Sequence, residues 1–354
     1  MTGNATATTP LLHGIGPPLI SNYDYERLPE RLSSMGKPES PLVTFTKSRP
    51  DDSGKCFPQA IAHRGYKMKY PENTMVAFEG AVKAGANALE TDIHLSRDGV
   101  VVLAHDATLK RCFSIDKKVI DCDWSFLRTL HTTEAPHVHM PRLQDLLEYL
   151  TLPGLEDIWV ILDIKLDNDT EQVMKLIAST IEAVPPGTKP WNQRVVLGCW
   201  ATKYIPLRDL YLPHFLIAHI GFSIPYARQF FATPNVAFSM LGKILMGPRG
   251  KRFIRDVRSH NRELFAWTIN SEEEMKWCIK NELDGVLTDD IDKYMEVRKR
   301  FSSGTEESKG FSILALLNIL RVNFLAYLLS FIFQWRFGLL DGIDRKDQTI
   351  DQKH

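Results

Sequence analysis

Several residues capable of acid–base or metal chemistry lie within one segment, residues 61–106, which reads IAHRGYKMKYPENTMVAFEGAVKAGANALETDIHLSRDGVVVLAHD. Four of them, His63, Glu90, Asp92 and His105, draw attention first. Each belongs to or follows an apolar run typical of a buried strand. Ionisable side chains are rare in such strands unless they are paired or functional. The segment therefore predicts a site at the ends of neighbouring strands.

Glu90 and Asp92 are spaced to act together. Positions i and i+2 of a strand share a face, and two close carboxylates repel unless a cation or a proton lies between them. Asp163, in ILDIK, adds a third oxygen from a neighbouring strand. An all-oxygen site suits Mg²⁺ or Ca²⁺. In the alternative interpretation, Glu90 and Asp92 lie on an exposed edge and bind no metal.

The two histidines indicate proton transfer. A lone histidine in a strand is more often structural, but His63 and His105 both lie near the predicted metal, where one can accept a proton while the other donates one. Arg64 has the planar fork that suits a phosphate, and Lys165 adds a second positive charge. This combination is typical of a phosphodiester site.

Glu72 has two interpretations. It precedes a helix expected over 73–84, so it can be a first-turn acid favoured by the helix dipole. It can also orient a histidine or Arg64, and we favour this second role.

Nine apolar segments alternate with helical patterns, which fits either a (β/α)8 TIM barrel or a doubly wound sheet. The expected strands are 59–65, 87–95, 99–106, 158–165, 194–200, 215–221, 236–240, 264–270 and 284–290. The expected helices are 73–84, 142–150, 170–183, 202–210, 225–231, 242–258, 271–280 and 290–301. Polar residues follow many of these strands, and only a barrel gathers all such ends on one rim. We therefore predict the barrel.

Composition limits the function classes. The 354 residues are 44% hydrophobic, and 43 Lys and Arg balance 43 Asp and Glu, so no net field attracts nucleic acid. Five scattered cysteines indicate reduced thiols. Residues 1–55 are expected to be a flexible lead-in and 56–302 the catalytic domain.

The segments HRGYKMKYPENT, ETDIHLSRDGVVVLAHD, LDIK, AWTIN and DGVLTDD carry a resemblance. Over about residues 58–298, the chain resembles the glycerophosphodiester phosphodiesterase family, closest to its fungal phosphatidylglycerol-specific phospholipase C branch. Two positions depart from the family pattern. Asp163 stands where a glutamate is usual, so the third ligand is one methylene shorter, and Ile291 replaces a proline at a helix start.

The resemblance implies a TIM barrel and roles for the site residues. The metal ligands would be Glu90, Asp92 and Asp163, the catalytic pair His63 and His105, the phosphate contacts Arg64 and Lys165, and the pocket wall Trp267. In the implied reaction, a free glycerol hydroxyl attacks phosphorus and forms a cyclic phosphate that water opens. We assign His63 as the base and His105 as the acid.

The segment 311–335, FSILALLNILRVNFLAYLLSFIFQW, is long enough to span a bilayer, and a polar tail, 336–354, follows it. Arg321 and Asn323 divide it into two apolar runs whose lengths suit an interfacial or re-entrant segment. A buried helix or an oligomer contact is the alternative. The preceding EVRKRF is expected to meet anionic lipid.

These features predict a cytosol-facing enzyme on the endoplasmic reticulum, a lipid droplet or the mitochondrial surface, acting on a glycerophospholipid without an obligate protein partner. Two alternatives remain. The same chemistry can serve soluble deacylated glycerophosphodiesters such as glycerophosphocholine, or the barrel can be a catalytically silent membrane-bound module.

Overall fold

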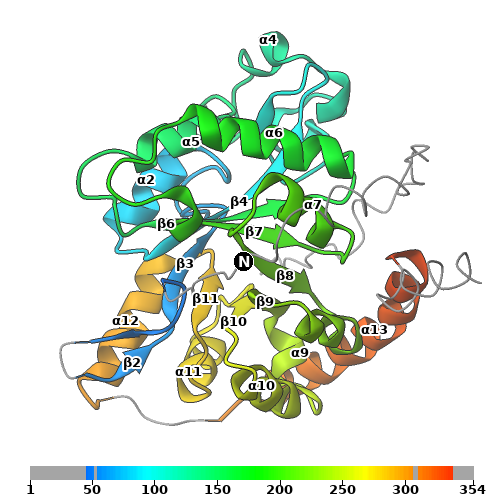
Figure 1. The fold of residues 1–354 in the computed structure, drawn as a ribbon. Coiled ribbons are helices and arrows are strands. Elements are labelled where there is room, and N and C mark those ends of the chain that lie inside the picture. The colour runs from blue at the N-terminus through cyan, green and yellow to red at the C-terminus, as the bar shows by residue number, and fades with distance from the viewer. Residues whose placement is uncertain (1–44, 52–53, 306–309, 338–354) are drawn as a thin grey trace, which may run out of the picture.

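The computed structural model describes residues 45–51, 54–305 and 310–337. Eight parallel strands close into a barrel because β3 pairs with both β4 and β11 (Figure 1). Around the barrel they are β3 (Gln59–His63), β4 (Ala88–Leu95), β6 (Trp159–Ile164), β7 (Val195–Cys199), β8 (Leu216–Gly221), β9 (Val236–Leu241), β10 (Leu264–Trp267) and β11 (Gly285–Thr288). The predicted TIM barrel is confirmed, and the doubly wound sheet is excluded.

The segment 99–106 is not a barrel strand. Its ordered part, β5 (Val101–Leu103), runs antiparallel to β4, with Leu103 opposite Ile93. Residues 96–100 are too few for the crossover that a parallel pair requires, so the chain turns back at Gly99, whose φ is +82°. The turn returns the chain to the rim, where the Ala104 amide donates to the Asp92 carbonyl (3.0 Å).

The apolar runs are buried on both faces of the barrel. Side chains such as Ile61, Trp159 and Phe265 fill the interior, while their strand neighbours pack outward against the helices. This double burial explains why the strands read as continuous apolar runs rather than alternating ones.

The helices surround the barrel (Figure 1). They are α2 (Met75–Lys83), α3 (Lys110–Phe113), α4 (Trp124–Leu127), α5 (Leu143–Leu150), α6 (Thr170–Ala183), α7 (Tyr204–Tyr211), α8 (Ile224–Ala227), α9 (Gly242–Met246), α10 (Gly250–Ser259), α11 (Glu272–Lys280), α12 (Ile291–Ser302) and α13 (Ile313–Phe337). The helix expected over 242–258 is two helices, because Pro248 lies between α9 and α10 and cannot donate a backbone hydrogen bond.

Part of the expected lead-in lies beneath the barrel. β1 (Arg49–Pro50) pairs with β2 (Cys56–Phe57), and the Phe45 ring meets Trp159 edge-on at 5.7 Å. The Gln59 amide donates to the carbonyls of Phe45 (2.8 Å) and Lys47 (2.6 Å). Residues 1–44 lie outside the described residues.

The apolar segment near the carboxyl end forms one continuous helix, α13, rather than two separate runs. Asn323 does not interrupt it, because its side-chain amide donates to the Ile319 carbonyl within the helix (2.8 Å). The helix continues through Phe337, and the remainder of the expected polar tail lies outside the described residues. By length and composition, α13 is the one described helix that could cross a membrane, although 17% of its most apolar window is buried against the protein.

Candidate active site

Three carboxylates meet on the rim formed by the carboxyl ends of the strands. Asp92 of β4 and Asp163 of β6 are partners in the sheet, and Glu90 precedes Asp92 on the same face. All three are buried, and one oxygen from each lies within 4.8 Å of the others. The exposed-edge alternative for Glu90 and Asp92 is therefore wrong.

The triad concentrates negative charge that a proton or a cation can neutralise. Burial and the charges of Asp92 and Asp163 raise the pKa of Glu90 well above its usual range. Burial would also raise the pKa of Asp92, but Lys165 and Arg64 outweigh it and hold that pKa well below its usual range. A buried, all-oxygen set of this kind fits Mg²⁺ or Ca²⁺.

Lys165 lies closer to the triad than the sequence suggested. Its ammonium is 2.6 Å from Asp92 Oδ1 and 2.6 Å from Asp163 Oδ2. The Trp200 indole donates to the other Asp163 oxygen (2.7 Å) and so fixes the orientation of this shorter ligand. Lys165 can therefore neutralise the carboxylates as well as face a phosphate.

His63 lies at the end of β3 with a carboxylate behind it. Its Nδ1 is 2.7 Å from Asp289 Oδ1, and the Asn270 amide donates to Asp289 Oδ2 (2.7 Å). An Asp289 that accepts from Nδ1–H leaves the His63 Nε2 lone pair free to take a proton.

His105 has a corresponding partner in the loop that follows β5. Its Nδ1 is 2.7 Å from Asp106 Oδ1. The Arg111 guanidinium donates to Asp106 Oδ2 (2.7 Å) and to both oxygens of Glu72 (2.7 and 2.9 Å). Each histidine thus has its tautomer fixed by an aspartate, as a proton-transfer pair requires.

Glu72 supports Arg64 in the way we favoured from the sequence. Glu72 Oε1 accepts from Arg64 Nη1 (3.0 Å), and Arg111, Arg64 and Lys67 overcome the effect of burial and lower the Glu72 pKa to about 2. Arg64 Nε is buried without a hydrogen-bond partner among the described residues, 3.4 Å from Asp92. The guanidinium is thus held between Glu72 and Asp92 at the edge of the triad.

The local backbone explains the HRG and PENT motifs. Arg64 has a φ of +59°, and its amide donates to Glu90 Oε2 (2.8 Å) while its carbonyl accepts from the Asn73 amide (2.9 Å). The Asn73 side chain donates to Asp92 Oδ2 (2.7 Å). A Cβ at Gly65 would lie 2.7 Å from that of Ala77, so only glycine fits.

Two tryptophans contact one another beside the triad. Trp267, expected there from the sequence, donates from its indole to the Ser239 carbonyl (2.9 Å). Trp200 meets it edge-on, with ring centroids 5.8 Å apart. Both are half-buried, so they present apolar surface beside the triad.

Several supporting residues were missed by the sequence reasoning. Asp106 and Asp289 stand in the quoted motifs but received no role, although each directly follows a predicted strand-end residue. Arg111, Asn73 and Trp200 gave no separate signal, because their function depends on contacts that sequence spacing does not encode.

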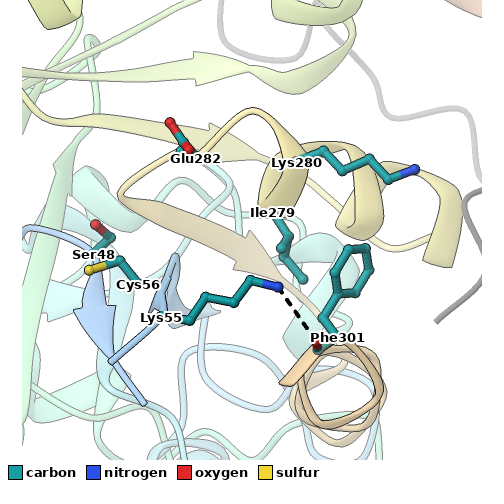
Figure 2. A pocket seen from close by; sticks show the side chains of 7 residues that line it. All are labelled: Ser48, Lys55, Cys56, Ile279, Lys280, Glu282 and Phe301. Atoms are coloured by element: carbon teal, nitrogen blue, oxygen red, sulfur yellow. Dashed lines mark hydrogen bonds between the residues drawn. The ribbon is translucent and has the colours of Figure 1, made fainter. Parts of the chain in front are cut away.

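A hollow on the other side of the barrel contains none of these residues. It is lined by Ser48, Lys55, Cys56, Ile279, Lys280, Glu282 and Phe301, and the Lys55 ammonium reaches toward the Phe301 carbonyl (3.5 Å) (Figure 2). The Ser48 amide donates to Asp284, which precedes β11, so this hollow is at the amino end of the strands. TIM-barrel chemistry occurs at the opposite end.

The comparisons with known proteins agree with this geometry. Residues 63–293 match the model of the Glycerophosphoryl diester phosphodiesterase family. The chain belongs to this family. It is thus a phosphoric diester hydrolase, in a family that generally depends on divalent metals, and its buried triad could hold one. Membership of this family of hydrolases argues against the alternative of a catalytically silent, membrane-bound module.

Relatives match across the catalytic domain. A glycerophosphodiester phosphodiesterase of Bacillus altitudinis is 25% identical over 244 residues, covering 68% of this chain and 97% of that protein. Human lysophospholipase D GDPD1 is 25% identical over 283 residues, covering 69% and 87%. The fold of a phosphodiesterase from Oleispira antarctica, solved with its product sn-glycerol-3-phosphate, superposes with a TM-score of 0.60 at 19% identity, covering 69% of this chain and 97% of that one.

Asp289→Asn is expected to shift the pH dependence of the reaction. Burial and then Arg64 lower the pKa of His63 from 6.5, while Asp289 raises it. If His63 is the base, kcat/KM falls as pH decreases through this pKa, so the acidic limb lies below pH 6.5. Removing the Asp289 charge should move the limb to lower pH and reduce kcat/KM by about 10²-fold. A pH profile of both enzymes checks this, and a limb that stays in place would separate Asp289 from His63.

Proposed function

We propose that this enzyme is a phospholipase C that cleaves phosphatidylglycerol to diacylglycerol and glycerol phosphate. The observation that carries the proposal is the convergence on one rim of the acidic triad and two histidines, each with its own aspartate. The lipid substrate is supported by α13, an exposed apolar helix on the same chain.

The first step is an internal attack. His63 Nε2 takes the proton of the headgroup 2-hydroxyl, and that oxygen bonds to phosphorus while the bond to the diacylglycerol oxygen breaks. His105, protonated, gives its Nε2 proton to the departing oxygen, which leaves as diacylglycerol. The internal hydroxyl is worth roughly 7 kcal/mol or more in favourable cases, because attack needs no second molecule.

The second step returns both histidines to their starting states. His105, now neutral, takes a proton from a water molecule while the water oxygen attacks phosphorus. His63 donates its proton to the glycerol 2-oxygen, which leaves phosphorus as the cyclic phosphate opens. The products are glycerol phosphate and an enzyme ready for another lipid.

The charged groups hold the phosphate through both steps. Arg64 and Lys165 face its non-bridging oxygens, and Glu72 keeps Arg64 in place. A divalent cation, Mg²⁺ or Ca²⁺, held by Glu90, Asp92 and Asp163 would stabilise the charge that develops on those oxygens. Trp267 forms the wall of the pocket.

We further propose that the enzyme works on a cytosol-facing membrane of the endoplasmic reticulum, a lipid droplet or the mitochondrial surface. The exposed apolar surface of α13 supports a membrane-bound location, and the free cysteines agree with a reducing compartment.

The substrate assay tests the proposal. We expect the full-length protein to release diacylglycerol from phosphatidylglycerol in mixed micelles with Mg²⁺ or Ca²⁺, and to lose at least about 10²-fold of this rate with EDTA or as His63→Ala. Glycerophosphocholine is the parallel substrate. Choline release without diacylglycerol release would contradict the phospholipase proposal and support the second candidate, a phosphodiesterase for soluble deacylated substrates.

A further inference from the structure

Helix α13 is attached to the catalytic rim rather than to the floor of the barrel. Ser330 Oγ is 2.5 Å from Ser223 Oγ, and Ser223 follows the carboxyl end of β8. The Asn323 amide donates to the carbonyl of Lys243 (2.7 Å), in the helix that follows β9. These strand ends belong to the same rim as the triad.

Only one stripe of α13 makes these contacts. Ile319, Ala326 and Ser330 are its buried residues, and with Asn323 they recur at helical spacing along a single face. Gly247 accommodates this face, because a Cβ there would lie 2.1 Å from Asn323 Oδ1. The contact between α13 and the barrel is therefore closely packed at Gly247, and its buried polar groups are hydrogen-bonded.

The attached helix lies beside the site wall. Gly242, the first residue of α9, would place a Cβ 2.4 Å from Ile269 and 3.5 Å from the Trp267 carbonyl. The next residue of α9, Lys243, accepts the hydrogen bond from Asn323. A short path thus leads from Trp267 through α9 to α13. Figure 1 shows α9 beside α13.

Apart from Asn318 and Arg321, the exposed surface of α13 is mostly apolar. Phe324 is 63% exposed, Phe331 58% and Trp335 87%. The other exposed large apolar side chains of this face include Leu314, Leu317 and Leu328. A continuous apolar surface of this length indicates a binding surface rather than scattered exposed residues.

One basic side chain contacts α13, and other exposed basic residues follow it along α10. The Arg249 guanidinium lies over the Tyr327 ring of α13, 5.1 Å from its centroid. Lys251, Arg252 and Arg255 of the adjoining α10 are exposed. The predicted lipid contact of EVRKRF is not supported, because Arg300 of α12 pairs with Glu272 (2.7 Å) and α12 contacts β3, four strands around the barrel from β8.

We propose that α13 lies in the plane of an anionic bilayer and, with the basic start of α10, holds the catalytic rim against the lipid surface. Apolar side chains would enter the bilayer while arginine and lysine meet lipid phosphates. Arg321, exposed on the helix, can extend to the phosphates from this depth, whereas a spanning helix would carry it toward the bilayer centre.

A spanning arrangement conflicts with the attachment. Lys243 forms an ion pair with Glu274 (2.8 Å) beside the contact to Asn323. A helix that crossed the bilayer in this position would carry these charges into hydrocarbon, or it would break its contacts with α8 and α9. The in-plane arrangement keeps these charges out of the hydrocarbon and preserves the contacts with α8 and α9. Its consequence for catalysis rests on the proposed function: phosphatidylglycerol would enter the site past Trp200 and Trp267.

Vesicle flotation tests the surface. The full-length protein is expected to float with phosphatidylcholine vesicles that contain phosphatidylserine, and roughly tenfold less with phosphatidylcholine alone. Phe324→Asp with Leu328→Asp should reduce the bound fraction by about tenfold or more. Ile120→Asp with Leu152→Asp is the matched control, since both side chains are exposed apolar groups outside α13. Equal loss in both pairs, or none in the first, would overturn the proposal.

Cysteine labelling tests the in-plane arrangement. In a Cys56→Ser background, Ser312→Cys and Arg336→Cys mark the two ends of α13. Both should react with an impermeant maleimide added outside sealed vesicles, and protection of position 336 until detergent is added would instead show a spanning helix.

Activity separates this inference from the proposed function. Turnover of glycerophosphocholine, if present, should be unchanged in the Phe324 and Leu328 double variant, while hydrolysis of phosphatidylglycerol in vesicles falls about tenfold or more. If wild type cleaves neither lipid nor soluble diester, the proposed function fails, but flotation and labelling still decide the position of α13.

Discussion

Asp92→Asn is expected to reduce kcat/KM by about 10³-fold or more, because the Asp92 carboxylate contacts more of the site than either of the other two acids. Asp92 pairs with Lys165, accepts a hydrogen bond from Asn73, and places an oxygen within 4.8 Å of oxygens of Glu90 and Asp163. Asparagine keeps the shape but removes the charge that draws a divalent cation. Steady-state rates over a range of Mg²⁺ and Ca²⁺ concentrations check this.

A second measurement does not depend on activity. A cation at a hundredfold its Kd stabilises the folded protein by about 2.7 kcal/mol, which corresponds to a Tm increase of roughly 5–10 °C for a domain of this size. Wild type should show this increase and Asp92→Asn should not. Asp209→Asn, which removes a carboxylate paired with Arg208 on α7, is the matched control and should behave as wild type. An Asp163→Ala enzyme with full metal-dependent activity would remove Asp163 from the triad.

The barrel and the triad could be predicted because both depend on short-range regularities. Apolar runs that end in polar residues identify buried parallel strands and their rim. The spacing of Glu90 and Asp92 places two carboxylates on one face wherever the strand lies. Asp163 required one further step, namely that its strand lies beside the strand of Glu90 and Asp92. The structure pairs β4 with β6, although an additional strand, 99–106, was expected between them.

The sequence was less informative where one element depends on another. The apolar run 99–106 has the composition of a barrel strand, and only the short connection before it indicates a hairpin. Lys165 was expected to face phosphate, and the structure also places its ammonium 2.6 Å from Asp92 and from Asp163, contacts that the sequence did not indicate. Arg111 joins Glu72 to Asp106 across a loop, a contact that no periodicity encodes.

Helix α13 illustrates a further limit. Hydropathy identified an apolar segment with two polar residues in it, and polarity alone suggested a break. The structure uses Asn323 as a contact to the barrel and leaves Arg321 exposed, so the helix continues through both. Tertiary contacts determine whether a polar residue ends an apolar helix or fastens it to the protein.

His63→Ala and His105→Ala are each expected to reduce phosphatidylglycerol hydrolysis by roughly 10²–10⁴-fold, since each removes one proton transfer at the phosphorus. Both side chains are partly buried on the rim and held by aspartates, so neither removal should disturb the barrel. His137→Ala, on an exposed loop outside the site, is the matched control.

The leaving group distinguishes the two roles. In a glycerophosphodiester with a p-nitrophenyl leaving group, the p-nitrophenolate departs without a proton. Hydrolysis of this substrate therefore needs a base but no acid in the first step. His105→Ala should therefore recover most of its lost rate on this substrate, while His63→Ala should remain about 10²-fold or more below wild type. The reverse pattern would exchange the assigned roles. Equal defects on both substrates would mean that the histidines orient the phosphate rather than move protons, because orientation is required whichever group leaves.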